Sequence, residues 1–345
     1  MAAVYHAEIN EALADPVLAA LLGRSATSAP FDRLAWLSLL AQECLAPDRC
    51  ILAVARDGDT VAVLPLRQHA AGLAPLANWY SFFVRPLCND AARMPELLTP
   101  LVQSLAPAGA LELAPMPEAE AMLMRAALRE AGWIGEIVPC DTNHVLEVGS
   151  RSFAEYWAAR PGQLRETVRR KGKKGVVRLR LETAFDPADW AAYEAIYALS
   201  WKPSEGNPAF LRRFAEAEAE ASTLRLGVAE IDGRAVAAQF WTVEGGTAYI
   251  HKLAHDEAAR QHSPGTLLSA MMFAHVIDQD RVALVDFGTG DDPYKRDWME
   301  SVRPRYRLEY YRPSAIRSWK GLAKLAARQI MRAERTPNLK QRPAA

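Results

Sequence analysis

The stretch HKLAHDEAARQHSPGTLLSAMM, residues 251–272, predicts a strand, a short polar turn and a helix that opens on Ser-Pro-Gly. Ser263 stands where a helix N-cap belongs, and Pro264 takes the first helical position, where its missing N–H costs nothing. Gly265 keeps the first turn bare, so free backbone N–H groups and the positive end of the helix dipole can meet a pyrophosphate. Ser-Pro is also an ordinary helix opening. The rest of the chain must therefore decide between a plain helix start and a phosphate site.

Length and composition limit the number of domains, the partners and the location that the chain can have. The chain has 345 residues, half of them apolar, which is enough to fill two cores. Its 41 basic and 41 acidic residues cancel, which argues against a protein that coats nucleic acid by global charge. No apolar run approaches the ~18 residues of a membrane span, and the N-terminal sequence lacks the bases and the apolar run of a signal peptide. We therefore expect a cytoplasmic protein.

The cysteines show no CxxC pair and no metal-ligand spacing with histidine. They are Cys44, Cys50, Cys88 and Cys140. We expect reduced, buried thiols and no metal site.

Strands and helices alternate twice along the chain. Residues 50–66 predict two strands around an Asp-Gly turn at 57–58, and two helices with a strand between them follow. Residues 224–243 repeat the strand-turn-strand, with an Asp-Gly pair at 232–233. We therefore expect an α/β fold of two tandem lobes, each a mixed twisted sheet flanked by helices.

We place the lobe boundary near residue 150, which gives an N-terminal lobe at 1–149, a second lobe at 150–312 and a tail at 313–345. The second lobe opens with nine Lys or Arg between residues 160 and 180, against a single acid, Glu166. Such a run is most often a solvated helix face. It also suits phosphate or an anionic lipid head group, and suits nucleic acid less well because no stacking aromatic is interleaved.

Five further motifs accompany the Ser-Pro-Gly turn. They are SWK at 200–202, HKLAHD at 251–256, DFGTGDDPYKRDW at 286–298, PFDRLAW at 30–36 and DTVAVLPL at 59–66. Together they resemble the acyltransferase domain of the CelD/BioF2-like branch of the GNAT superfamily. The resemblance implies two GNAT-like lobes, similar to Fem-type peptidoglycan ligases, of which the C-terminal lobe is active and the N-terminal lobe non-catalytic. It also implies acyl-CoA as co-substrate, no permanently bound cofactor, and transfer of an acyl group to a primary amine.

The resemblance assigns coenzyme contacts around the turn. Backbone amides there would hold the pyrophosphate, and the end of the preceding strand would line the pantetheine. The expected contacts are Leu253, Ala254, Arg260, Ser263, Gly265 and Thr266.

The chemistry needs a base for the ammonium, a donor for the thioester oxyanion and an acid for the leaving thiolate. His251 has an unperturbed pKa that suits a base, and Asp286 either orients it or is itself the base. Tyr294 is the candidate acid. The structural alternatives stay open, because a strand histidine is more often structural and Tyr294 can simply pack beside Trp298.

Four residues are expected to contact the substrate: Trp201, Lys202, Asp291 and Lys295. The lysines bind phosphate or substrate, or else are exposed amines. Asp291 and its neighbour Asp292 attract a cationic amine, or cap the helix that Pro293 opens.

The acceptor is the element that the sequence determines least, because specificity lies in loops. We favour an amphiphilic amino lipid, such as the sphingoid base of bacterial ceramide synthesis, over an amino sugar of an envelope polysaccharide. Two other classes stay open: a Fem-like ligase that uses charged transfer RNA, and a non-catalytic scaffold.

The tail is the reason for favouring a lipid. At 100° per residue, one side of a helix collects Ile316, Trp319, Leu322, Ala323, Ala326 and Ile330, and the opposite side collects Arg317, Lys320, Lys324, Arg328 and Arg332. Either the apolar stripe packs on the second lobe, or the helix lies on an anionic membrane surface. Nine bases and one acid from residue 312 onwards favour the membrane, so we expect a cytoplasmic protein that is peripheral on the inner membrane face.

Overall fold

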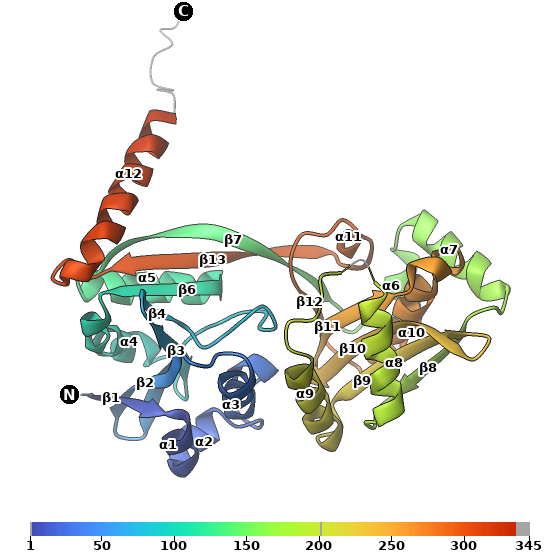
Figure 1. Cartoon of the computed structure of the whole chain (residues 1–345), viewed down its shortest axis with the longest axis horizontal. Coiled ribbons are helices and arrows are strands. Elements are labelled where there is room, and N and C mark those ends of the chain that lie inside the picture. The colour runs from blue at the N-terminus through green and yellow to red at the C-terminus, as the bar shows by residue number, and fades with distance from the viewer. Residues whose placement is uncertain (1, 201, 336–345) are drawn as a thin grey trace, which may run out of the picture.

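The computed structural model describes residues 2–200 and 202–335 (Figure 1). Its strands are β1 (Ala3–Glu8), β2 (Arg49–Asp57), β3 (Thr60–His69), β4 (Gly72–Pro75), β5 (Leu87–Cys88), β6 (Ala110–Pro117), β7 (Ile134–Glu147), β8 (Arg178–Glu182), β9 (Leu224–Ile231), β10 (Arg234–Glu244), β11 (Thr247–His255), β12 (Leu284–Thr289) and β13 (Ser301–Tyr311). Its α-helices are α1 (Ile9–Ala14), α2 (Pro16–Leu21), α3 (Leu34–Glu43), α4 (Met94–Ser104), α5 (Glu118–Glu130), α6 (Phe153–Ala158), α7 (Gly162–Lys173), α8 (Pro187–Ala198), α9 (Pro208–Glu220), α10 (Pro264–Asp278), α11 (Lys295–Trp298) and α12 (Trp319–Arg335). Short 3₁₀ helices are η1 (Pro30–Asp32), η2 (Ala106–Ala108), η3 (Glu257–His262) and η4 (Ile316–Ser318).

One mixed sheet runs through both halves of the molecule (Figure 1). The strand order is β1-β2-β3-β4-β6-β13-β7-β12-β11-β10-β9-β8, and β5 pairs with β3 beside this path. Helices α4 and α5 pack on the N-terminal part, and α8 and α10 pack on the C-terminal part. The predicted fold class, two tandem GNAT-like lobes of mixed sheet and helix with a C-terminal helix, is confirmed.

Strands β7 and β13 connect the two parts. They pair antiparallel from Val145 with Ser301 to Ile134 with Tyr311, and β13 also pairs with β6. The chain therefore leaves the C-terminal half on β13 and ends its sheet path beside a strand of the N-terminal half. The other edge of β13 pairs with β6 from Arg305 to Tyr311, and the other edge of β7 pairs with β12 between Asn143 and Glu147.

Both predicted Asp-Gly hairpins are present, but they differ by one position. Asp57 pairs with Thr60, so the first turn is formed by Gly58 and Asp59. Ile231 pairs with Arg234, so the second turn is formed by residues 232 and 233. Glycine suits both turns because φ is positive there, at 62° for Gly58.

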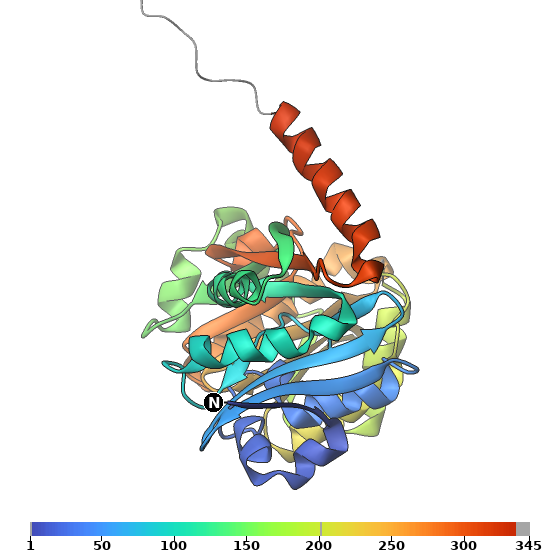
Figure 2. The same cartoon turned by 90° about the vertical axis from the view of Figure 1, so that its left-hand side faces the viewer.

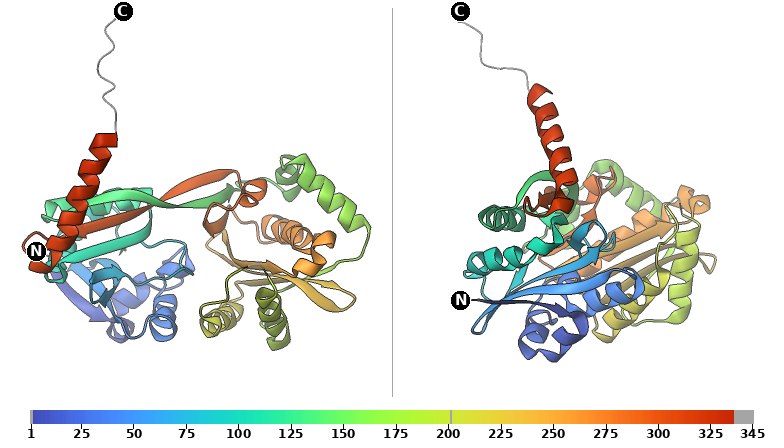
Figure 3. Two further views of the ribbon diagram at one scale, coloured as in Figure 1. Left: turned by 45° about the horizontal axis from the view of Figure 1, so that its top comes forward. Right: turned by 60° about the vertical axis from the view of Figure 1, so that its left-hand side comes forward.

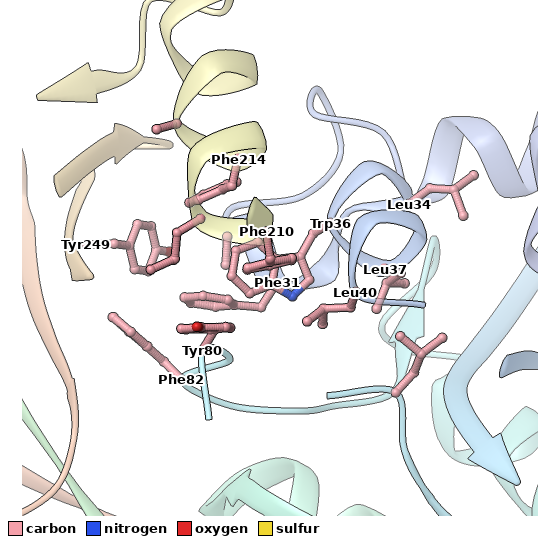
Figure 4. Close-up of a cluster of buried hydrophobic side chains, with 14 of the residues drawn as sticks. Phe31, Leu34, Trp36, Leu37, Leu40, Tyr80, Phe82, Phe210, Phe214 and Tyr249 are labelled. Carbon is pink, nitrogen blue, oxygen red and sulfur yellow. The ribbon is translucent and has the colours of Figure 1, made fainter. Parts of the chain in front are cut away.

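A buried aromatic core lies between the two halves (Figure 4). Trp36 of α3 packs edge to face on Phe214 of α9, with ring centroids 4.7 Å apart. Tyr80, from the loop after β4, stacks on Phe210 at 5.0 Å. An ion pair accompanies these rings, because the buried Arg33 guanidinium lies 2.9 Å from a carboxylate oxygen of Glu218. The halves therefore share a core, and side chains of the first half bury strands of the second.

Helix α12 begins beside the N-terminal part of the sheet and projects away from the body (Figure 2, Figure 3). Leu325 is 2% exposed, and Arg328 pairs with Glu309 at 2.9 Å and with Glu136 at 3.3 Å. This inward face is not the predicted apolar stripe. Trp319 is 62% exposed, and Ile316 and Ile330 are also exposed, so that stripe does not pack on the protein.

The cysteines are free but only half-buried, which corrects the expectation of buried thiols. Across residues 2–200 and 202–335, no helix has the length and apolar character to cross a bilayer.

Candidate functional site

A cavity of about 670 Å³ opens in the C-terminal half where α10 begins. The end of β11, η3 and the first turn of α10 form one wall. The segment from β12 to α11 and Leu164 of α7 complete it. Polar and charged side chains make up much of the lining: Gln239, His255, Glu257, Arg260, Ser263, Thr266, Ser269, Asp292, Tyr294 and Asp297.

The predicted helix start at Pro264 is confirmed, and its geometry is unusual. Ser263 has a left-handed backbone, with φ of 54°, and among the described residues its side chain makes no capping hydrogen bond. Its own N–H donates to the carbonyl of Arg260 at 3.0 Å. The expectation that Ser263 caps the helix and offers an amide to phosphate is therefore wrong.

Two other amides remain at the opening of α10. Leu267 is the first residue whose N–H closes a helical bond, 3.1 Å from the Ser263 carbonyl. The amides of Gly265 and Thr266 precede it, so the helix itself gives them no acceptor. They carry the positive end of the helix dipole into the cavity, which lies against both residues.

All six predicted coenzyme contacts line the cavity: Leu253, Ala254, Arg260, Ser263, Gly265 and Thr266. The end of β11, the strand that precedes the turn, also lies along the cavity. β11 pairs with β12 only from Thr247 to Tyr249, and the two strands then diverge. Backbone groups of Leu253 and Ala254 on that side of β11 therefore face a gap rather than a partner strand. Whether they bind a coenzyme stays a prediction.

Gly265 has room for a methyl group. A Cβ there would lie 3.5 Å from His255 Nδ1, an ordinary contact. Its carbonyl accepts from Gln239 Nε2 at 3.2 Å, and the same amide nitrogen also donates to Ser269 Oγ at 2.8 Å. A long side chain at this position would have to enter the cavity.

His255 was missed by the sequence analysis. It lines the cavity and lies 3.1 Å from Glu257, measured between His255 Nε2 and Glu257 Oε1. Burial is the largest influence on His255 and lowers its pKa. The signal was its position two residues after Leu253, because residues i and i+2 of a strand share a face.

Acidic and aromatic side chains line the other wall. Asp292 and Asp297 contribute carboxylates, and Tyr294 lies edge-on to Phe287 with ring centroids 5.7 Å apart. Burial, followed by the charge of Asp292, raises the pKa of Tyr294, so its hydroxyl stays protonated at neutral pH. Tyr294 pairs with Phe287 here rather than with the Trp298 ring that the sequence suggested.

Asp291 faces away from this lining. Its two carboxylate oxygens contact His144 Nε2 at 2.8 Å and the Arg296 guanidinium at 2.7 Å. Asp291 therefore fixes the segment after β12 onto β7, and Asp292 is the aspartate of the predicted pair that reaches the cavity.

His251 lies in the aromatic core between the halves, outside the described cavity lining. Its ring stacks on Phe240 at 5.1 Å and meets Phe214 edge to face at 5.2 Å. Burial lowers the pKa of His251 to about 3, so the ring is neutral at physiological pH. Its role as the base stays a prediction, which this placement does not favour.

Asp286 is buried on β12, and its carboxylate accepts hydrogen bonds that hold the chain in place there. Its carboxylate accepts from Asn143 Nδ2 at 2.6 Å and from the Gly288 N–H at 2.8 Å. Burial raises its pKa. These bonds shape the bend after β12, and the contacts of His251 run to Thr242 instead. The predicted orientation of His251 by Asp286 is therefore not what the structure contains.

Lys295 and Lys202 differ from exposed amines. The Lys295 ammonium is buried and donates to the carbonyls of Thr289 and Gly290, which holds the loop before α11. Burial, with the charge of Lys252 next, lowers the pKa of Lys202 to about 8. Trp201 lies outside the described residues.

The cavity is therefore bipolar. The open amides, Arg260 and its neighbour Glu257, 3.8 Å away, come from η3 and the start of α10, and Asp292, Asp297 and the protonated Tyr294 come from the segment between β12 and the end of α11. Such a site can hold a phosphate-bearing ligand and a cationic group at the same time. Within the described part of the chain, no group of His, Cys, Asp or Glu side chains has the arrangement of a metal site.

Residues 159–296 match the family model of the acetyltransferase (GNAT) domain. This range contains the opening of α10, the end of β11 and most of the cavity lining. The resemblance to the GNAT superfamily that was inferred from the sequence motifs is confirmed over these residues of the C-terminal half. No curated protein matches the chain in sequence.

Solved structures resemble the whole chain. The C-terminal domain of an Agrobacterium fabrum protein named as a lysylphosphatidylglycerol synthetase matches 93% of this chain over 97% of its own, with a TM-score of 0.58 and 11% identity. FemX matches 80% of this chain over 95% of its own, with a TM-score of 0.55 and 11% identity. A tandem GNAT protein of the clavulanic acid pathway matches 91% over 100%, with a TM-score of 0.52 and 13% identity. At such identities the likeness shows the fold, a Fem-like pair of GNAT lobes.

Proposed function

On the premise that its C-terminal half carries a GNAT-type acyltransferase domain, we propose that this protein transfers an acyl group from acyl-CoA to a primary amine. The observation that carries the proposal is the bipolar cavity at the opening of α10. A coenzyme A thioester needs a pyrophosphate cradle beside an open strand edge, and an amine acceptor needs a carboxylate close to the thioester. The cavity lining contains both, the amides at the opening of α10 and the carboxylates of Asp292 and Asp297 after β12.

The donor would lie along β11 and reach α10. The amides of Gly265 and Thr266 would hold the pyrophosphate, with Arg260 adding charge at the rim. The open backbone of Leu253 and Ala254 would pair with the amide groups of the pantetheine arm. The thioester would then arrive where β11 and β12 diverge.

The reaction forms one bond and breaks one. The neutral amine attacks the thioester carbonyl, a C–N bond forms, the C–S bond breaks, and coenzyme A leaves as a thiolate. Asp292 and Asp297 would attract the ammonium form of the acceptor, and its proton would pass to a carboxylate or to solvent. Tyr294, held protonated by burial, would donate a proton to the thiolate. The attacking nitrogen releases one proton as it becomes an amide, and this proton would restore the phenol directly or through solvent.

The favoured acceptor is an amphiphilic amine of the sphingoid-base type. The support is α12, whose Trp319 and Ile330 are about 60% exposed, flanked by Lys320 and Lys324. An exposed apolar stripe bordered by bases suits an anionic membrane surface, where such an amine and a long-chain acyl-CoA both partition. The protein would then act as a peripheral membrane enzyme. An amino sugar is the alternative acceptor.

The test follows product and binding separately. Purified protein is incubated with a long-chain acyl-CoA and, in parallel, a sphingoid base or an amino sugar, and the N-acyl product is identified by mass spectrometry. Coenzyme A at 100 times its dissociation constant should stabilise the fold by ~2.7 kcal/mol in thermal unfolding. Stabilisation without any N-acyl product would keep the coenzyme site and remove both acceptors. The absence of stabilisation by any thioester would favour a scaffold or a Fem-like ligase that uses charged transfer RNA.

A further inference from the structure

The basic helix α7 forms part of the cavity wall, a position that its sequence did not reveal. Leu164 lines the cavity and belongs to the hydrophobic core beneath α10. Two turns further on, the Lys171 ammonium donates to the carbonyl of Gln261, which precedes the α10 opening by only a few residues. A Cβ at Gly172 would lie 3.9 Å from Leu267 of α10. The C-terminal half of α7 is therefore fixed against the phosphate end of the cavity.

The charges of α7 are mostly unpaired. Arg169 forms a salt bridge with Glu166 at 2.7 Å, which accounts for the one acid of the helix. Over the described residues, no carboxylate lies within salt-bridge distance of Arg170, Lys171 or Lys174. Partial desolvation, followed by the positive charges of Arg170 and Lys174, lowers the pKa of Lys171. An anion at this point would relieve the repulsion among the three cations.

Coenzyme A carries a second anionic group near its pyrophosphate. The adenosine ribose bears the pyrophosphate at its 5′ oxygen and a separate phosphate at its 3′ oxygen. A pyrophosphate on the amides of Gly265 and Thr266 would leave the 3′-phosphate one ribose away, outside the cavity mouth. Lys171 is held by its bond to Gln261, which directly follows Arg260 of the cavity lining.

We propose that Lys171, supported by Arg170 and Lys174, forms a binding site for the 3′-phosphate of coenzyme A. This inference rests on the proposed function, and it names what the enzyme requires of its donor. The site would select coenzyme A thioesters over dephospho-coenzyme A thioesters and over acyl groups carried on a bare phosphopantetheine. The basic run thereby becomes a specificity determinant of the donor site.

A nucleic acid is the competing ligand for the same charges. The sequence of α7, GQLRETVRRKGK, contains no aromatic side chain on which a base could stack. The Lys171 ammonium is also anchored to Gln261, the residue after Arg260 of the cavity lining. Both observations favour a small ligand with a discrete phosphate.

The experiment compares coenzyme A with dephospho-coenzyme A, which lacks only the 3′-phosphate, by isothermal titration on the full chain. The native protein is expected to bind coenzyme A about tenfold more tightly, a difference of about 1.4 kcal/mol. Lys171→Met is expected to remove most of this preference by weakening coenzyme A binding, with dephospho-coenzyme A unchanged. Lys171→Arg is expected to retain it. Lys320→Met on α12 removes the same charge far from the cavity and should leave the preference intact.

Each other outcome overturns the assignment. Equal affinity of the native protein for both ligands removes the 3′-phosphate site and leaves the proposed function standing. Equal weakening of both ligands by Lys171→Met would place the lysine at the pyrophosphate instead. Failure of both ligands to bind the native protein would remove the proposed function itself. Binding of an RNA hairpin that Lys171→Met abolishes, without binding of coenzyme A, would assign the basic helix to nucleic acid.

Discussion

His251 Nε2 lies 2.8 Å from the hydroxyl oxygen of Thr242, on the strand next to its own. This bond joins two side chains of the sheet beneath the aromatic core, and the ring is enclosed by Phe31 and Phe82 from the N-terminal half as well as by its own lobe. A histidine so enclosed is a neutral packing residue with one satisfied nitrogen. Its effect on the protein is therefore expected in stability before catalysis.

The first prediction concerns acid stability. The pKa of His251 is about 3 in the folded chain, against 6.5 for an ordinary histidine, so the unfolded chain binds one more proton between these values. The contribution of the neutral His251 to the free energy of unfolding is complete above pH ~6.5. It is lost as the pH falls towards 3, by roughly 1.4 kcal/mol per pH unit. Between pH 7.5 and pH 5, the free energy of unfolding is expected to fall by about 2 kcal/mol less in His251→Phe than in the native protein.

Urea unfolding of both proteins at the two pH values measures this difference. Thr242→Val is the control, because it removes the hydrogen bond and keeps the titrating ring. Turnover supplies a separate reading. A hundredfold loss of turnover in folded His251→Phe, with unchanged coenzyme binding, would return the role of base to this histidine.

The candidate site could be predicted from the sequence where its signals are local. The six expected coenzyme contacts line the cavity because they belong to one strand-turn-helix segment, whose order along the chain fixes their order in space. Pro264 favours a helix start at this position through its fixed φ, whatever surrounds it. The two-lobe α/β class followed from alternating patterns and motifs in the same way.

The predicted roles of His251 and Asp286 depended on contacts between residues far apart in the sequence, which the sequence patterns do not reveal. The environment of His251 depends on Phe82, which lies 169 positions earlier, and Asp286 bonds to Asn143 across a strand pairing that no local pattern encodes. Ser263 shows a different failure. Its residue type fits an N-cap, but its left-handed backbone directs the N–H to Arg260 and leaves its side chain without a capping bond among the described residues.

The second prediction concerns the opening of α10. Gly265→Glu is expected to weaken coenzyme A binding at least a hundredfold, because a carboxylate would enter the cavity at the amides that we assign to the pyrophosphate. Isothermal titration measures the affinity, and circular dichroism checks the fold.

Gly265→Ala is the matched control. The added methyl group would lie 3.5 Å from His255 Nδ1, so the fold accommodates it, and coenzyme affinity is expected to change by less than about threefold. Normal binding by the glutamate variant would remove the phosphate site from this helix.

The third prediction concerns Tyr294. Tyr294→Phe keeps the ring on Phe287 and removes the hydroxyl, so kcat is expected to fall about 10²-fold with little change in coenzyme affinity. Because the raised pKa of Tyr294 keeps it protonated, the native rate should show no loss from this group between pH 6 and 9. Steady-state kinetics measures both. Tyr5→Phe, on β1 far from the cavity, is the control, and equal kcat in the two variants would exclude Tyr294 as the acid.

The last prediction concerns α12, whose inward face is occupied by Leu325 and Arg328. Its opposite face presents Trp319 at 62% exposure and Ile330 at 60%. Burying either side chain in a bilayer interface is worth up to about 2 kcal/mol. Each nearby base adds about 1 kcal/mol on an anionic surface.

Liposome co-sedimentation of the full chain is expected to show binding to anionic vesicles at low salt, and weaker binding to neutral vesicles. Trp319→Glu combined with Ile330→Glu should abolish it, because both charges would enter the apolar interface. Leu13→Glu alters a side chain that is 60% exposed on α1, far from α12, and should leave binding unchanged. If the α12 variant sediments like the native protein, the exposed stripe does not contact lipid. The proposal of an amphiphilic acceptor then loses its support, because a soluble amine needs no membrane-bound enzyme.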